Sequence, residues 1–151
     1  MQVTCHGVWV RYNHRVMLDS FLVPDATVVT AKGDSEPLEI STAASCTFLL
    51  TLTIREVVEQ ESIEVTLATS ADGTNWDPKP VAVYPQKFYP GQYPLLVDLS
   101  SAANAKFVRA HWEVSRWGRG ATTPRFVLGL RIREVTSQEL AEAQVEAMSR
   151  R

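Results

Sequence analysis

Apolar and polar side chains alternate with a period of two along much of the chain, which is the pattern of a half-buried β-strand. The clearest example is residues 46–55, where nearly every second side chain is large and apolar. The two faces of this expected strand carry Phe48, Leu50, Leu52 and Ile54 on one side and Thr47, Thr51 and Thr53 on the other. Leu49 falls on the threonine side, where a neighbouring segment would have to cover it.

Three further segments repeat this alternation, and we expect them to be strands as well. Their inward positions are Ile63, Val65 and Leu67 in residues 62–70, Val108, Ala110, Trp112 and Val114 in 106–116, and Phe126, Leu128, Leu130 and Ile132 in 125–135. Their outward positions include Arg109, His111, Glu113, Arg131 and Arg133. We interpret the acidic stretch 56–61, between the first two strong strands, as a solvated hairpin connection.

Weaker strand patterns occupy 8–12, 16–23, 26–31, 38–42 and 95–99, the last beginning just after Pro94. Seven or more short strands with turn residues between them indicate an all-β, two-sheet antiparallel sandwich. The long connections 77–94 and 115–125 favour a jelly-roll or Greek-key order over a simple meander.

The chain leaves the sheets at Thr136, which begins a capping box with Glu139 three residues later. This pattern predicts a short C-terminal α-helix through about Met148, so residues 1–136 form the sandwich and residues 137–151 form a helix and tail of the same domain. The apolar stripe of this helix is narrow, consisting of Leu140, Ala141, Val145 and Met148. It either packs on its own domain or contacts a neighbouring copy.

Length and composition agree with one globular domain: 151 residues, 45% apolar and 21% charged. No run approaches the roughly 18 apolar residues of a membrane helix, and no signal peptide is apparent. We therefore expect a soluble protein of the cytoplasm or of a virion, with no membrane partner. Two cysteines do not make a disulfide framework, so we expect Cys5 and Cys46 to be free thiols, with pairing left open.

The net charge of −2 is unevenly distributed. Residues 1–104 hold 6 Lys and Arg against 12 Asp and Glu, or −6, whereas residues 105–151 hold 9 against 5, or +4. Such an asymmetry either reflects ordinary surface variation or steers copies of the chain together head to tail. Nucleic-acid binding would need a stronger basic excess, and we do not expect it.

The strands carry no motif of a metal, nucleotide or nucleophile site. His6, His14 and His111 lie outside any metal-ligand spacing, and the chain lacks C-x-x-C, H-E-x-x-H, G-x-S-x-G and a phosphate-binding glycine loop. We expect His111 to be a surface histidine. Paired carboxylates of the glycosidase kind stay open, because such pairs meet only in the fold. The expectation is a protein that is not an enzyme and holds no metal or cofactor.

Residues 72–77 read D-G-T-N-W-D, which admits two interpretations. A calcium loop would need a closing glutamate about eleven residues after its first ligand, where this chain has Val83. Asp-Gly readily adopts positive φ. We therefore predict a tight hairpin turn.

The best binding candidates are aromatic and basic residues of the later loops: Trp76, Phe88, Tyr89, Tyr93, Arg116, Trp117 and Arg119. Exposed Trp and Tyr together with Arg are the side chains that anchor protein interfaces. Tryptophan also stacks on sugar rings, so a glycan site built on Trp76 and Trp117 is the alternative. We expect Trp112 and Tyr84 instead to cap the ends of the core.

Three segments resemble a β-sandwich pattern of phage and prophage virion proteins. They read I-E-V-T-L-A-T-S-A-D-G-T-N-W in 63–76, A-K-F-V-R-A-H-W-E-V in 105–114 and T-P-R-F-V-L-G-L-R-I in 123–132. The S-x-D-G-x-x-W part is also similar to galactose-binding-like jelly rolls of the discoidin type. Those domains usually carry a disulfide joining their ends and a signal peptide. Here Cys5 and Cys46 do not lie at the two ends and no signal peptide is apparent, so the virion resemblance is favoured. The N-terminal third matches neither pattern.

These observations together predict a non-catalytic structural protein that acts through protein–protein contacts. The resemblance implies a repeated subunit of a virion-like particle, as a head decoration, head–tail or tail component. We expect it to form a dimer or trimer with itself and to bind a larger protein assembly. The N-terminal segment, the 77–94 connection and the C-terminal helix are the expected contact elements. The alternative is a carbohydrate-binding module.

Overall fold

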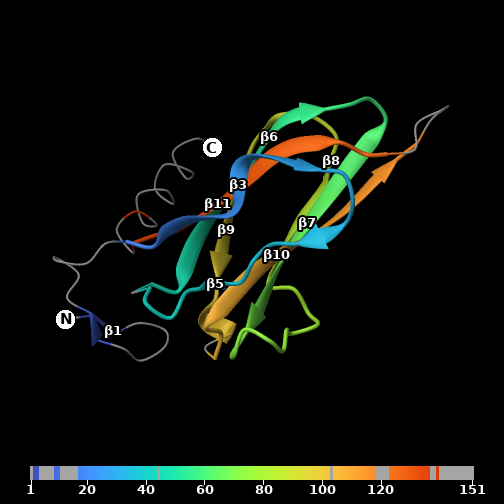
Figure 1. The fold of residues 1–151 in the computed structure, drawn as a ribbon. Helices are drawn as coiled ribbons and strands as arrows, with labels where there is room; N and C mark the ends of the chain where they lie inside the picture. Colours follow the sequence, from blue (N-terminus) through green and yellow to red (C-terminus); the bar gives the residue numbers. More distant parts are fainter. Residues whose placement is uncertain are drawn as a thin grey trace.

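A computed structural model describes residues 2–3, 9–10, 17–43, 45–102, 104–117, 123–136 and 139. Two antiparallel sheets lie face to face as a sandwich (Figure 1). The first sheet has the order β3 (Asp19–Val29), β11 (Phe126–Glu134), β6 (Thr47–Val57) and β9 (Gly91–Asp98). The second has the order β4 (Gly33–Asp34), β10 (Phe107–Arg116), β7 (Glu61–Ser70) and β8 (Ala82–Lys87), with β5 (Leu38–Glu39) also paired to β10.

Three short elements complete the described structure. Strands β1 (Gln2–Val3) and β2 (Trp9–Val10) pair with each other, and a 3₁₀ turn, η1 (Ser100–Ala102), follows β9. None of the helices in the described ranges is long and apolar enough to cross a membrane.

The order of pairing identifies the sandwich as a jelly roll. Early strands pair with late ones: β3 with β11, β4 and β5 with β10, β6 with β9, and β7 with β8. The chain is therefore one long antiparallel ribbon, which rolls up when β6 pairs with β11 and β7 with β10. Of the two orders that the long connections favoured, this is the jelly roll, which contains two Greek keys.

The core lies between the sheets and contains the inward positions predicted from the alternation. Along β6, buried and half-buried residues alternate from Thr47 to Ile54, and Leu49 is half-buried as expected. Phe48, Leu52, Ile63, Val108, Phe126 and Ile132 are fully buried. Tyr84 is also buried, and half-buried Trp112 packs against the core while its indole N–H donates to the carbonyl of Ala31 at 3.0 Å. Both residues pack with the core, but they do not cap its ends as predicted, because each pairs with Val65 in the middle of β7.

The interpretation of 56–61 as a solvated hairpin is wrong. Strands β6 and β7 belong to different sheets, so this segment crosses from one sheet to the other. Glu61, at its end, is 1% exposed. Its carboxylate accepts backbone N–H groups from Val58 at 2.9 Å and Arg125 at 2.7 Å. The acidic composition predicted an exposed segment, but the Glu61 carboxylate is buried and accepts hydrogen bonds from the backbone.

The 77–94 connection is shorter than predicted, because it contains β8 and the beginning of β9. Pro85 and Pro94 obscured these strands, since a proline inside a run argues against a central strand. Both strands lie at the edge of their sheets, where a missing N–H is tolerated. Strand β9 therefore begins at Gly91, before Pro94 rather than after it.

The segments predicted as two strands, 16–23 and 26–31, form one long strand interrupted by a bulge. The register of β3 against β11 moves from Leu128↔Thr27 to Leu130↔Val23, which places two extra residues in β3. Within the bulge Ala26 has φ +63°. Arg55 donates two hydrogen bonds, of 2.8 and 2.6 Å, to the carboxylate of Asp25, and they hold the pKa of this carboxyl below its usual value.

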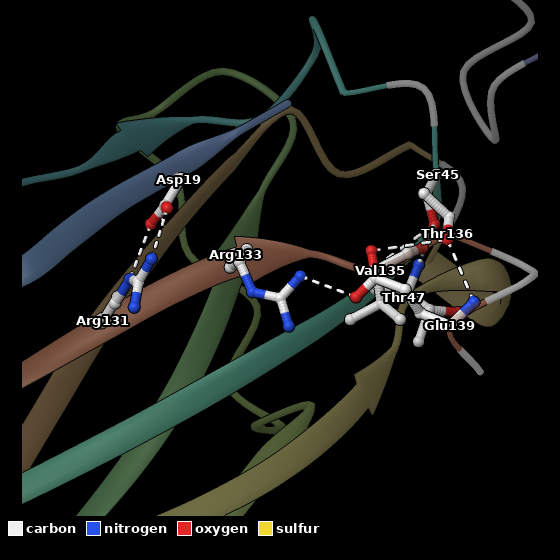
Figure 2. Close-up of polar contacts among 8 residues, drawn as sticks. All are labelled: Asp19, Ser45, Thr47, Arg131, Arg133, Val135, Thr136 and Glu139. Carbon is white, nitrogen blue, oxygen red and sulfur yellow. Dashed lines mark hydrogen bonds and ion pairs between the residues drawn. The ribbon is translucent and has the colours of Figure 1, made fainter. Parts of the chain in front are cut away.

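At the end of β11 the chain makes the capping contact that the sequence predicted. The Glu139 N–H donates to the Thr136 hydroxyl at 3.1 Å, and the Glu139 carboxylate accepts from Arg133 at 2.8 Å (Figure 2). The hydrogen bond from Arg133 is the main cause of a lowered Glu139 pKa. Apart from Glu139, which is helical, the predicted helix lies outside the described residues.

Candidate functional site

An exposed cluster of aromatic side chains lies at one end of the sandwich. Phe88 and Tyr89 follow β8, and Trp117 follows β10. The ring centroids of Phe88 and Trp117 are 6.2 Å apart in an edge-to-face arrangement, and those of Phe88 and Tyr89 are 6.4 Å apart. The exposed fractions are 42% for Phe88, 74% for Tyr89 and 46% for Trp117. We call this region, residues 57–61, 88–90 and 117, the aromatic end.

The sandwich brings these distant residues together because three chain segments leave its sheets at the same end. Glu61, the first residue of β7, pairs with Arg116, the last of β10. The next N–H, that of Trp117, donates to the carbonyl of Gln60 at 2.8 Å and fixes Trp117 beside the β6–β7 crossing. The β8–β9 crossing lies at this end as well, because Lys87 pairs with Ile63.

Tyr93 and Lys87 lie next to the aromatic cluster and contact it or each other. The Tyr93 hydroxyl donates to the carbonyl of Tyr89 at 2.6 Å, and the Lys87 ammonium lies 4.5 Å from the centre of the Tyr93 ring. A hollow of about 540 Å³ opens beside them. It is lined by Val57, Val58, Glu59, Gln60, Glu61, Phe88, Tyr89, Pro90 and Trp117.

Four of the seven predicted site residues therefore gather here: Phe88, Tyr89, Tyr93 and Trp117. Arg116 is adjacent, with its guanidinium donating to the Thr123 carbonyl at 2.9 Å. Arg119 lies outside the described residues.

Trp76 lies at the opposite end, so the glycan site built jointly on Trp76 and Trp117 is wrong. Trp76 bridges to Ser70, and the β7–β10 pairing runs from Phe107↔Ser70 to Arg116↔Glu61. Nine steps of about 3.3 Å place the two ends about 30 Å apart. One sugar ring cannot contact both tryptophans. The sequence around each tryptophan did not reveal how far apart Trp76 and Trp117 lie in the fold.

At its own end Trp76 lies beneath the Arg109 guanidinium, which is 4.5 Å from the ring centre. A second hollow, of about 410 Å³, lies between the loop after β7 and the η1 turn. Its lining combines the indole with small and polar residues: Thr69, Ser70, Ala71, Asn75, Trp76, Asp77, Ser101, Ala102, Asn104 and Ala105.

The 72–77 segment is a turn, as predicted. Gly73 has φ +84°, and Asp72 accepts the N–H groups of Thr74 and Asn75 at 2.9 Å each. These two backbone hydrogen bonds are the largest causes of a strongly lowered Asp72 pKa. The carboxylate therefore holds the loop closed.

Two buried carboxylates, Glu61 and Glu134, were missed by the sequence analysis. Glu134 is 0% exposed, and its oxygens accept the N–H groups of Leu18 at 2.6 Å and Ser45 at 3.2 Å. The strand phase was the available signal, since Glu61 continues the inward series 63, 65, 67 and Glu134 continues 128, 130, 132. The two lie at opposite ends of the sandwich. Glu134 pairs with Phe48 at one end of β11, whereas Phe126, at the other end, pairs with Val57 and follows Arg125, whose N–H binds Glu61. They do not form a catalytic pair.

His111 lies between two carboxylates on the outer face of the second sheet. Its Nδ1 is 2.8 Å from Asp34 and its Nε2 is 3.0 Å from Glu113. In the described parts of the chain no three His, Cys, Asp or Glu residues are placed to hold a metal ion. Partial burial lowers the pKa of His111, but the hydrogen bonds with Glu113 and Asp34 and their charges outweigh it, so the net shift is upward.

We predict that folding stability falls as the pH rises through the raised pKa of His111. A folded-state pKa above the unfolded value of about 6.5 stabilises the fold below that pH, and the contribution is lost above the raised value. The effect is below about 1 kcal/mol because the pair is solvent-accessible. Thermal unfolding across this pH range should show a decrease that is absent in His111→Gln. An equal decrease in the variant would contradict the prediction.

Cys46 is a half-buried free thiol. Burial, and then the charge of Asp98, raise its pKa. Cys5 lies outside the described residues, and the expectation that it is a free thiol stays a prediction.

No protein-family model matches the sequence, and no curated protein resembles it. Among solved structures, one chain of infectious bursal disease virus, Gt strain, has a TM-score of 0.40 and 11% identity to this chain. The match covers 78% of this chain but only 30% of the viral one. A likeness of this size adds nothing to the strand order and the site geometry described above.

Proposed function

We propose that this protein is a non-catalytic subunit that works by protein–protein contact through the aromatic end. The observation that carries the proposal is the exposed cluster of Phe88, Tyr89 and Trp117 around an open hollow. Aromatic side chains are enriched in the buried centres of interfaces. Three large, partly exposed aromatic rings gathered in one place are typical of a surface that a partner covers.

The larger setting we propose is a repeated subunit of a virion-like particle, as a head decoration, head–tail or tail component. The sequence resemblance of residues 63–76, 105–114 and 123–132 supports it. Jelly rolls serve in viral capsids and in lectins, and a fold alone does not decide between such functions. The self-contact would form a dimer or trimer, in the virion or the cytoplasm, without nucleic acid, membrane or cofactor.

We predict that Trp117→Ala weakens self-association by at least about tenfold in dissociation constant, as expected for a central aromatic of an interface. Sedimentation velocity over a range of concentrations measures the effect. Leu96→Ser is the matched control, because Leu96 is 48% exposed, close to the 46% of Trp117, but lies on β9. A monomeric wild type at high concentration, or equal effects of both substitutions, would contradict the proposal.

Carbohydrate binding is the second candidate, and the hollow beside Trp76 favours it. An indole next to Asn75, Asp77 and Asn104 offers a stacking face and hydrogen-bonding groups in one concave place. Glycan-array binding that Trp76→Phe removes and Trp117→Ala leaves intact would favour this function over the first.

A further inference from the structure

The aromatic end combines ring faces with the exposed carboxylate of Glu59, and we propose that its hollow binds an arginine side chain presented by a partner protein. This inference rests on the proposed function, because it names the chemistry that the same surface recognises in its partner.

The rings provide walls in different orientations rather than one flat stack. The planes of Phe88 and Trp117 stand at 75° to each other, and those of Phe88 and Tyr89 at 54°. The faces of aromatic rings carry negative charge density, which attracts a cation placed within about 6 Å of the ring centre. Several such walls around one hollow are suited to an organic cation.

The polar lining of the hollow is acidic. Glu59 is exposed there, and among the described residues it forms no ion pair. Behind it the buried carboxylate of Glu61 is held by the N–H groups of Val58 and Arg125. The exposed carboxylate of Glu59 is therefore the group that presents negative charge to a ligand in the hollow.

Three described basic side chains around the aromatic end have partners other than Glu59. Lys87 lies over Tyr93, Arg116 donates to the Thr123 carbonyl, and Arg125 lies 3.6 Å from Glu56. None of the three lines the hollow. Within the described part of the chain Glu59 therefore has no basic partner, and a cation from another molecule would complement it.

Arginine fits this lining better than the other partner side chains. Its planar guanidinium stacks on aromatic rings and also donates a pair of hydrogen bonds to a carboxylate. The ammonium of lysine is a compact, more strongly hydrated charge. An aliphatic partner side chain would remove water from Glu59 without replacing its hydrogen bonds, which disfavours it.

The test uses a pair of peptides that differ in charge but hardly in shape, acetyl-Gly-Arg-Gly-amide and its citrulline counterpart. Amide NMR titration of the full chain should show saturable shifts of the Trp117 indole N–H and of residues 57–61 and 88–90. We expect the citrulline peptide to bind at least about fivefold more weakly, because it lacks the charge. The arginine peptide should also weaken as the salt concentration rises.

Two variants locate the effect. Glu59→Gln, at an exposed position where the fold should not suffer, is expected to weaken the arginine peptide about threefold or more. Glu64→Gln, an exposed glutamate on β7, is the control and should leave binding unchanged. Equal binding of arginine and citrulline, tighter binding of a leucine peptide, or no saturable shift would overturn the inference. The proposed protein contact would still stand in those cases if Trp117→Ala abolishes self-association.

Discussion

Glu134→Gln should lower the free energy of unfolding by about 3–5 kcal/mol, the largest effect on stability that the structure predicts. In the wild type one carboxylate accepts from Leu18 ahead of β3 and from Ser45 ahead of β6. Glutamine keeps the shape but has a single acceptor oxygen, and its NH₂ would face a backbone N–H. A buried donor facing a donor loses a charge-assisted hydrogen bond and leaves a polar group unsatisfied.

Urea unfolding with a fitted midpoint and slope measures this loss. Glu64→Gln is the matched control, since Glu64 is exposed on β7, and its change should stay within about 0.5 kcal/mol. A loss at position 134 no greater than at position 64 would mean that the two backbone groups find water or another acceptor when the carboxylate is removed.

Gly129→Ala should lower the free energy of unfolding by about 2–3 kcal/mol, as overpacking against backbone does. A Cβ at position 129 would lie 2.7 Å from the Cα of Asp25, in the bulge of β3. Backbone cannot turn aside as a flexible side chain can, so either the bulge shifts or β11 moves away from β3.

Gly33→Ala tests whether any added methyl group would do the same. There the Cβ would lie 3.2 Å from the ring of Trp112, a half-buried side chain that can move slightly. We expect a clearly smaller loss of thermal stability at position 33. If both variants lose the same stability, the close approach of β3 to β11 is not the reason for glycine at 129.

The alternation of apolar and polar residues predicted most of the strands and their buried positions, because side chains in a strand point alternately to the two faces. Residues 46–55 show this best, since each inward position is buried. The same phase also placed Glu61 and Glu134 on the inward face. Because glutamate is usually exposed, neither was predicted to be buried. A charged residue in phase with the core is better understood as a buried acceptor for backbone.

Crossings between sheets were the part that sequence did not reveal. An acidic stretch between two strands has the same composition whether it turns back in one sheet or passes to the other, so 56–61 was misinterpreted. For the same reason the distance between Trp76 and Trp117 could not be predicted, because it depends on which strand ends meet. Phe88 and Trp117 are 29 positions apart in the sequence and yet in contact.

Pro85 and Pro94 bear on how copies of this molecule can meet. Strands β8 and β9 form the corresponding edges of the two sheets, and each includes a residue that has no N–H to offer. An incoming strand needs a regular row of donors and acceptors to extend a sheet, and these prolines interrupt that row. Growth into fibrils by strand addition is thereby disfavoured along this side, and copies brought close together must recognise one another through side chains.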